Sequence, residues 1–267
     1  MVVHIVLHGL DEYTGFVTYN GSCWSRPKWV AHSFLGHGIL VALSCASASF
    51  CVVVGDAVRG AYPHAQFFGP AAVYNGHSWG SLDEVAANAQ LQAVDCTSPT
   101  FCLAVGWTGR GGGSTRRGQP RGFVVIWNGS SWKSASVSRD YMLMNVSCAS
   151  SAFCVVTGAK APSTIFPGDS TFSYRSDTNV ALIYHNGSSS QPQVIDSHQL
   201  TSISCRSSSL CVAVDVDGDA VTYSSSSWEA PRIVPGMSLA IAIACARSSL
   251  CLAGDFKGNV FTASSVG

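Results

Sequence analysis

Ten of the eleven cysteines form five pairs with one spacing, Cys-x5-Cys, and this regularity constrains the fold more than any other feature. The first cysteines of the pairs lie at positions 45, 96, 148, 205 and 245, at intervals of 51, 52, 57 and 40 residues. Self-similarity at such a period indicates a repeat architecture. The chain of 267 residues therefore contains five cysteine-bearing copies of one structural unit.

Each pair is predicted to form a local disulfide that closes a β-hairpin. Facing residues on antiparallel strands have Cα atoms about 4.5–5.5 Å apart, within reach of a disulfide. A zinc site would more often space its thiolates by about two to four residues and would add histidines nearby. The predicted disulfides are Cys45–Cys51, Cys96–Cys102, Cys148–Cys154, Cys205–Cys211 and Cys245–Cys251, and Cys23 lies outside the pairs as an expected thiol.

Five disulfides favour an oxidising compartment over a cytosolic location with reduced, buried thiols. We therefore expect a secreted or cell-surface protein. The segment Met1–His8 lacks the basic flank and the long apolar stretch of a signal peptide, so this expectation rests on the cysteines. Two apolar stretches, Gly38–Gly55 and Ser238–Gly254, each contain a cysteine pair and are interpreted as hairpins and not as membrane spans.

Every repeat has the same order of elements. An apolar strand leads into the first cysteine, a short turn follows, and a second apolar strand begins at the second cysteine, as in Cys51–Gly55 and Cys102–Gly106. A third strand ends in Asn-Gly, the strongest short signal for a hairpin, as in Ala72–Gly76 and Val125–Gly129. A weaker fourth strand completes the unit, and no segment shows a sustained helical period.

Four antiparallel strands per repeat predict an all-β fold, a β-propeller of four-stranded antiparallel blades. A β-sandwich does not repeat one hairpin motif five times, and the coils of a β-helix are shorter. We expect a single domain over residues 1–267, with a partial blade over 1–34 and repeats that start near residues 39, 91, 142, 200 and 239. Six blades, two of them incomplete, are favoured, and five blades are the alternative.

The turn after the third strand carries a short motif, Gly-x-x-Trp, at Gly21–Trp24, Gly76–Trp79 and Gly129–Trp132. This motif resembles the tail of the Asp-box (BNR) repeat of sialidase-like β-propellers. The Asp of that box is replaced here by Tyr19, Tyr74 and Trp127. The Ser-Cys-x5-Cys hairpins are also similar to repeats of secreted actinobacterial proteins. Both resemblances imply a repeat fold, and neither implies an activity by itself.

Composition and acid content bear on the class of function. Charged residues make up 11% of the chain and the formal net charge is zero, which argues against nucleic-acid binding driven by bulk charge. A propeller glycosidase needs two well-placed acids, or an arginine cluster with acids and a tyrosine. No such set can be assembled, so no catalytic residue and no cofactor is assigned. A binding or interaction module is expected, with a sialidase-like or other glycoside hydrolase as the alternative.

The connections between second and third strands are long in three repeats, at 57–70, 109–121 and 160–177. Long loops on the rim of a rigid scaffold are where binding sites usually lie. One of them carries four arginines and no acid, and guanidinium groups suit carboxylate, sulfate or phosphate. The predicted partner is a glycan or another anionic extracellular polymer, or a protein. The candidate ligand-binding residues are Trp107, Arg110, Arg116, Arg117, Arg121, Tyr174 and Arg175.

Alternating aspartates at Asp215, Asp217 and Asp219 resemble the oxygen ligands of a calcium loop. The aligned segment of the next repeat has Lys257 in place of Asp217. The feature that the two repeats share is a turn centred on glycine. No metal site is therefore predicted.

Overall fold

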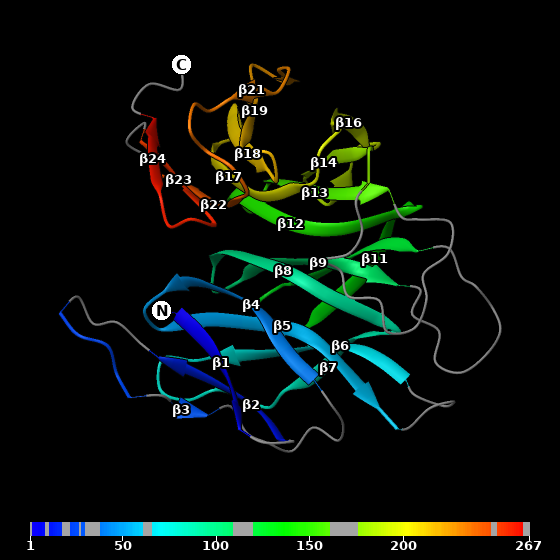
Figure 1. The fold of residues 1–267 in the computed structure, drawn as a ribbon. Coiled ribbons are helices and arrows are strands. Elements are labelled where there is room, and N and C mark those ends of the chain that lie inside the picture. Colours follow the sequence, from blue (N-terminus) through cyan, green and yellow to red (C-terminus); the bar gives the residue numbers. More distant parts are fainter. Residues whose placement is uncertain are drawn as a thin grey trace. The chain divides into compact units, whose positions relative to one another are not determined.

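The structure is a computed structural model that describes residues 2–8, 11–17, 22–26, 28–29, 38–60, 66–108, 120–160, 176–246 and 250–263. The regular elements of these residues are β-strands in antiparallel sheets (Figure 1). Among them, no helix has the length and apolar character needed to cross a membrane. The chain divides into two compact units, Met1–Ser136 and Val137–Gly267, and each is described by itself.

The first unit holds three sheets whose strands follow chain order. The first sheet comprises β1 (Val2–His8), β2 (Asp11–Val17) and β3 (Lys28–Trp29). The second comprises β4 (Gly38–Ser47), β5 (Phe50–Arg59), β6 (Gln66–Tyr74) and β7 (Asp83–Ala87). The third comprises β8 (Ala89–Ser98), β9 (Phe101–Thr108), β10 (Arg121–Trp127) and β11 (Trp132–Arg139).

The second unit also holds three sheets, and in two of them the outer strand is split into two short pieces. The fourth sheet comprises β12 (Tyr141–Ser150), β13 (Phe153–Lys160), β14 (Asn179–His185), β15 (Ser188–Ser189) and β16 (Gln193–Asp196). The fifth comprises β17 (Leu200–Ser207), β18 (Leu210–Asp215), β19 (Asp219–Ser224), β20 (Ser227–Trp228) and β21 (Arg232–Ile233). The sixth comprises β22 (Ala240–Cys245), β23 (Cys251–Asp255) and β24 (Val260–Ala263).

These sheets confirm the predicted all-β repeat of antiparallel strands. The first strand of each cysteine-bearing sheet begins within two residues of the predicted repeat start, at Gly38, Ala89, Tyr141, Leu200 and Ala240. The split outer strands account for the weak fourth-strand signal in the sequence. The number of blades and the single-domain organisation stay predictions.

In the second to fifth sheets the second strand is buried on both faces, which explains its continuous apolar sequence. All side chains from Cys51 to Val54 are buried, and so are those from Cys211 to Val214. A strand covered on both faces has no solvent side, so its sequence does not alternate. The core between the second and third sheets includes Val52, Val54, Leu91 and Ala104, and that between the fourth and fifth includes Val155, Ile195, Leu200 and Ala213.

All five predicted disulfides are present and join the first strand to the second strand of one sheet. They are Cys45–Cys51, Cys96–Cys102, Cys148–Cys154, Cys205–Cys211 and Cys245–Cys251. The Cα atoms of each pair lie 3.9–4.0 Å apart, and the two cysteines face each other in register. Cys23 is exposed and keeps its thiol.

A serine that precedes the first cysteine connects neighbouring sheets. The Ser44 Oγ accepts a hydrogen bond from the Cys96 N–H at 2.9 Å, which links β4 to β8. The Ser147 Oγ accepts from the Cys205 N–H at 2.9 Å, and the Ser204 Oγ accepts from the Cys245 N–H at 2.9 Å. The Ser-Cys part of the motif therefore serves packing between sheets, while the cysteine pair serves the hairpin.

The two kinds of hairpin turn lie at the same end of each sheet. The Trp127 Nε1 donates a hydrogen bond to the Pro99 carbonyl oxygen at 3.0 Å, and the Asn186 N–H donates to the Ala152 carbonyl oxygen at 3.2 Å. In an antiparallel sheet the remaining connections must then lie at the opposite end. We call this opposite end, which carries the second-to-third connections and the crossings between sheets, the connection end.

Candidate functional site

One position near the end of the second strand is glycine in three sheets and aspartate in the two sheets where a tight turn follows. It is glycine in β5, β9 and β13, where a Cβ on Gly55, Gly106 or Gly158 would overlap a carbonyl oxygen of the first strand. In the last two sheets the same position holds Asp215, opposite Leu200, and Asp255, opposite Ala240. These two aspartates are the start of a tight turn into the third strand.

Both aspartates hold their turns by accepting backbone hydrogen bonds. The Asp215 Oδ1 accepts from the N–H groups of Asp217 and Asp219 at 3.0 and 2.8 Å. The Asp255 Oδ1 accepts in the same way from Lys257 and Asn259, at 2.9 Å each. This local capping is the usual role of Asp at a turn. The hydrogen bonds that Asp215 accepts within its turn explain part of the alternating acids of Asp215–Asp219. The next repeat has the same hydrogen bonds at Asp255 and no acid at position 257, in agreement with the alignment of the two repeats.

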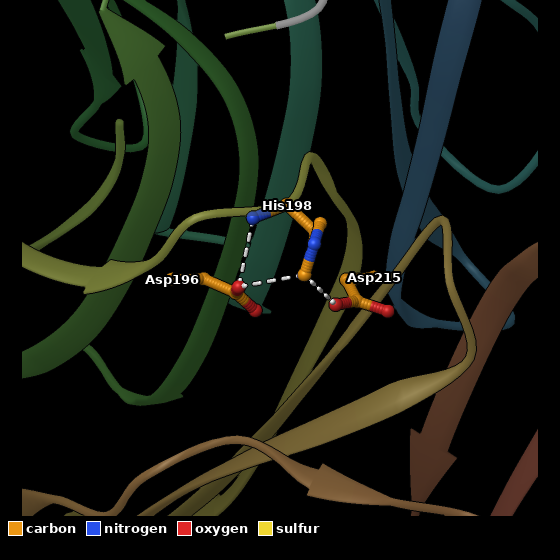
Figure 2. A group of neighbouring side chains, drawn as sticks. All are labelled: Asp196, His198 and Asp215. Atoms are coloured by element: carbon orange, nitrogen blue, oxygen red, sulfur yellow. Dashed lines mark hydrogen bonds and ion pairs between the residues drawn. The ribbon is translucent and has the colours of Figure 1, made fainter. Parts of the chain in front are cut away.

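Around Asp215, however, the connection end brings together a group that the sequence analysis did not single out. Asp196, the last residue of β16, and His198, in the crossing to β17, lie beside it (Figure 2). The His198 Nδ1 is 3.6 Å from the Asp196 Oδ1 and 3.6 Å from the Asp215 Oδ2. Among the described residues this is the group of His, Cys, Asp and Glu whose ligand atoms all lie within 4.8 Å of one another.

The two carboxylates are buried, and the imidazole is not. Both aspartate side chains are 0% exposed, whereas that of His198 is 45% exposed. The Asp196 Oδ1 accepts a hydrogen bond from the His198 N–H at 2.8 Å, which fixes the loop to the end of β16. The Oδ2 atoms of Asp196 and Asp215 are buried without a hydrogen-bond partner. Two buried carboxylates with unsatisfied oxygens are costly unless a cation or a proton compensates them.

The electrostatic environment of Asp215 differs from that of its counterpart Asp255. Burial raises the pKa of the Asp215 carboxyl; the Asp219 N–H opposes this effect, and the charge of Asp196 adds to it. Burial also raises the pKa of Asp255, but hydrogen bonds from the Asn259 side chain and backbone outweigh it, so that the pKa lies below its ordinary value. The two equivalent aspartates therefore have pKa values shifted in opposite directions.

Sequence reasoning missed this group because its members come from two connections. Asp196 and His198 belong to the crossing between the fourth and fifth sheets, and Asp215 belongs to the end of β18. An alignment of the repeats at their first strands would have marked His198 as a residue without a counterpart in the other repeats. His198 lies two residues before Leu200, the residue that faces Asp215 across the sheet. The residues at the same position in the other four repeats are Gly38, Ala89, Tyr141 and Ser238.

Most of the predicted ligand-binding residues lie outside the described residues: Arg110, Arg116, Arg117, Tyr174 and Arg175. Arg121 is exposed at the start of β10, where it pairs with Thr108. Trp107 is buried in β9, with 1% of its surface exposed, and pairs with Gln90 and Gly122. Trp107 thus lies in the core of the first unit and not on a rim, because β9 is a covered second strand. The ligand-binding role of the arginines stays a prediction.

The Gly-x-x-Trp motif has a structural role in its hairpin. Its Trp packs across the hairpin, with the rings tilted, against the aromatic residue five positions earlier. The ring centroids are 5.5 Å apart for Tyr74–Trp79 and 5.4 Å for Trp127–Trp132. In the fifth sheet Tyr223 and Trp228 form the same contact at 5.2 Å, although Ser225 stands in place of the glycine. Cross-strand aromatic pairs of this kind stabilise a hairpin. In the first of these turns the Asn75 Oδ1 accepts hydrogen bonds from the N–H groups of His77 and Ser78, a second contribution to the turn.

Comparisons with known proteins bear on the fold. No family model matches the chain, and no curated protein matches it. Among solved structures, it is similar to the WD40 β-propeller domain of Doa1, with a TM-score of 0.54, 10% identity, and coverage of 96% of this chain and 88% of that one. It is also similar to the RRP9 WD40 repeats, with a TM-score of 0.50, 10% identity, and coverage of 95% and 90%. Together with the repeated antiparallel sheets, these similarities establish a β-propeller fold, the class of protein to which the chain belongs.

Proposed function

We propose that the protein is a secreted or cell-surface binding module that captures an acidic glycan or another anionic extracellular polymer at the connection end of its sheets. The observation that carries the proposal is that the connections at one end of the sheets vary in length, whereas the disulfide-closed turns at the other end do not. At the turn end every cysteine-bearing sheet has the same six-residue disulfide separation. At the connection end the spacing from second to third strand ranges from the tight turn after Asp215 to the long connection between Lys160 and Asn179.

A rigid scaffold with variable loops at one end is the usual design of a binding protein. The disulfides support the extracellular part of the proposal, since such bonds persist in oxidising compartments. The connection from Thr108 to Arg121 supports the anionic part, because it adds Arg110, Arg116 and Arg117 to the exposed Arg121 without any acid between them. Guanidinium groups bind carboxylates and sulfates with paired hydrogen bonds.

The test is binding of the oxidised protein to an array of acidic and neutral polysaccharides. Arg116→Ala combined with Arg117→Ala is expected to weaken binding to an acidic polysaccharide about tenfold, since an ion pair formed in contact with solvent contributes roughly 0.5–1 kcal/mol. The remaining binding should depend less on salt. Arg232→Ala is the matched control, because this exposed arginine belongs to β21 and not to the connection from Thr108 to Arg121.

Three outcomes would contradict the proposal. Equal binding by the parent and the double variant would show that the arginines do not contact the polymer. Release of sugar from a bound glycan would favour the alternative, a glycoside hydrolase. Absence of binding to every polysaccharide, with capture of a purified extracellular protein, would identify a protein partner instead.

A further inference from the structure

The group Asp196, His198 and Asp215 offers two carboxylates and one imidazole to a single point at the connection end of the fifth sheet (Figure 2). We infer that these three side chains form a binding site for one divalent transition-metal cation, with Zn²⁺ and Mn²⁺ as the ions that fit the donors. The inference is independent of the proposed glycan binding, since it concerns other residues. A site of this kind does not follow from the fold, which needs only Asp215 for its turn.

Orphaned oxygens are the first support. The Oδ2 atoms of Asp196 and Asp215 are buried and accept no hydrogen bond, although each carboxylate is anchored through its other oxygen. Anchoring through Oδ1 fixes the direction in which the carboxylate lies and leaves Oδ2 to serve another partner. A cation supplies what both oxygens lack, and it removes the repulsion between two buried negative charges.

The distances are the second support. The His198 Nδ1 lies 3.6 Å from the Asp215 Oδ2, one of the orphaned oxygens, and 3.6 Å from the Asp196 Oδ1, which belongs to the same carboxylate as the other. Both distances are beyond the usual length of an N–H···O hydrogen bond, about 2.7–3.2 Å. Two ligands on a tetrahedral ion with bonds of about 2.0–2.1 Å are separated by about 3.3 Å. The spacing is therefore closer to that of ligands around a common ion than to that of a direct hydrogen bond. His198 is half-exposed, so its ring has room for a small adjustment.

An outer partner for the imidazole is the third support. The His198 Nε2 lies 3.4 Å from the Asp217 Oδ2, on the opposite side of the ring from Nδ1. Metal-bound histidines commonly donate the N–H of the second nitrogen to a carboxylate, which orients the ring and fixes the tautomer. At 3.4 Å the two atoms are slightly beyond hydrogen-bond length, and a small rotation of the exposed ring would let Asp217 accept that hydrogen and leave Nδ1 to coordinate.

The repeat itself provides an internal comparison. Asp255 holds the same register position as Asp215 in the next sheet, and the positions of Asp196 and His198 there are filled by Gly236 and Ser238. Asp255 obtains its charge compensation from the side chain of Asn259 instead, at 2.9 Å from its Oδ2. The fold thus builds this turn without a cation site, and the additional donors of the fifth sheet require a separate explanation.

The donor set selects the ion class. An imidazole nitrogen favours transition metals over Ca²⁺ and Mg²⁺, and two carboxylates favour hard or borderline ions over Cu(I). Because the His198 side is open to solvent, water can fill the remaining coordination positions. One ion per chain is expected, at a site that a soluble partner can reach.

The experiment uses metal-stripped, untagged protein with Cys23→Ser, so that the exposed thiol does not bind the probe. ZnCl₂ and, separately, MnCl₂ are titrated into it at neutral pH by isothermal calorimetry, and native mass spectrometry counts the bound ions. One equivalent of at least one ion is expected, removable by a chelator. His198→Ala and Asp196→Asn should weaken binding by more than about tenfold, and Asp217→Asn by about tenfold with unchanged stoichiometry.

His185→Ala and Asp255→Asn are the matched controls, an exposed histidine of the same unit and the equivalent aspartate of the next repeat. Both should bind the ion as the parent does. Excess metal should raise the melting temperature of the parent and both controls, because a ligand that binds the folded state stabilises it, and should leave that of His198→Ala unchanged. Failure of the parent to bind either ion, or equal binding by His198→Ala, would overturn the inference.

Discussion

Asp255 is a single residue whose ionised carboxylate stabilises a turn by accepting hydrogen bonds within it. Its carboxylate is buried and accepts hydrogen bonds from the backbone of Lys257 and from both the backbone and the side chain of Asn259. Burial alone would raise its pKa, but these hydrogen bonds lower the pKa below the ordinary value near 4. The ionised form is therefore favoured more in the folded chain than in the unfolded chain.

This shift predicts a pH-dependent effect of Asp255→Asn. A depressed pKa contributes stability that is present above the unfolded value of about 4 and is lost as the pH falls through the lower, folded pKa. Asn keeps an acceptor for the two backbone N–H groups but has no second oxygen for Asn259. The variant should melt below the parent at neutral pH, and the gap should narrow below about pH 4. Melting curves of both proteins from neutral to acidic pH measure this, and a gap that does not change with pH would refute it.

The first strand is the element that joins one sheet to the next. Its serine accepts a hydrogen bond from the cysteine N–H of the following first strand, in the pairs β4–β8, β12–β17 and β17–β22. The same strand carries the cysteine that closes its own hairpin. In the three repeats that have Ser-Cys, two adjacent residues thus serve the contact between sheets and the closure of the hairpin; the other two repeats have Asp95 and Ala244 in place of the serine.

Removal of one such serine should destabilise the fold. In Ser147→Ala the partly buried N–H of Cys205 loses its acceptor, at an expected cost of about 1 kcal/mol or more. Ser209→Ala is the control, since that hydroxyl lies on an exposed turn beside Ser207 and its loss should cost far less. Chemical denaturation of the oxidised proteins gives both values. Equal values for the two variants would mean that the link between sheets contributes no more than a surface contact.

In the second unit, described side chains of the sixth sheet are more exposed than their counterparts in the fifth. Val212 and Val214 of β18 are buried, whereas Leu252 of β23 is 41% exposed and Val260 of β24 is 68% exposed. The fifth sheet is covered on that face by the sixth, through β17 and β22. A propeller closes by placing its first sheet against its last, which protects edges that would otherwise pair with other chains. We predict that residues 1–34 provide this cover.

Two variants test the closure. Deletion of residues 1–34 should give an aggregating or poorly folded product, measured by size-exclusion chromatography and thermal melting. Leu252→Glu should lower the melting temperature clearly in the full chain, because it places a charge in the predicted contact. Ile233→Glu is the control at a position that is 80% exposed in the same unit. A soluble truncation that melts like the parent, or equal effects of the two glutamates, would show that the N-terminal segment does not complete the fold.

The sequence by itself determined the repeat, the hairpin disulfides, the Asn-Gly turns and the all-β class. Each of these depends on contacts between residues close in the chain: Cys45 faces Cys51 across one turn, and Tyr74 packs against Trp79 across another. Local spacing fixes such contacts, so the pattern of residues is enough to predict them. The same reasoning placed Trp107 wrongly on a rim, because its apolar neighbours in β9 do not reveal which faces of the strand are covered.

Only the tertiary structure brought Asp196 and His198 to Asp215. The three residues belong to the end of β16, a crossing between sheets and the end of β18, so their approach depends on how two sheets pack. In the sequence, Asp215 is explained fully by its turn, and nothing near it marks the acid and the imidazole that arrive from the preceding connection. Packing between sheets decides which polar groups are buried together and which of their oxygens remain unsatisfied. Charge compensation, and with it the candidate metal site, is therefore a property of the assembled sheets and not of any one repeat.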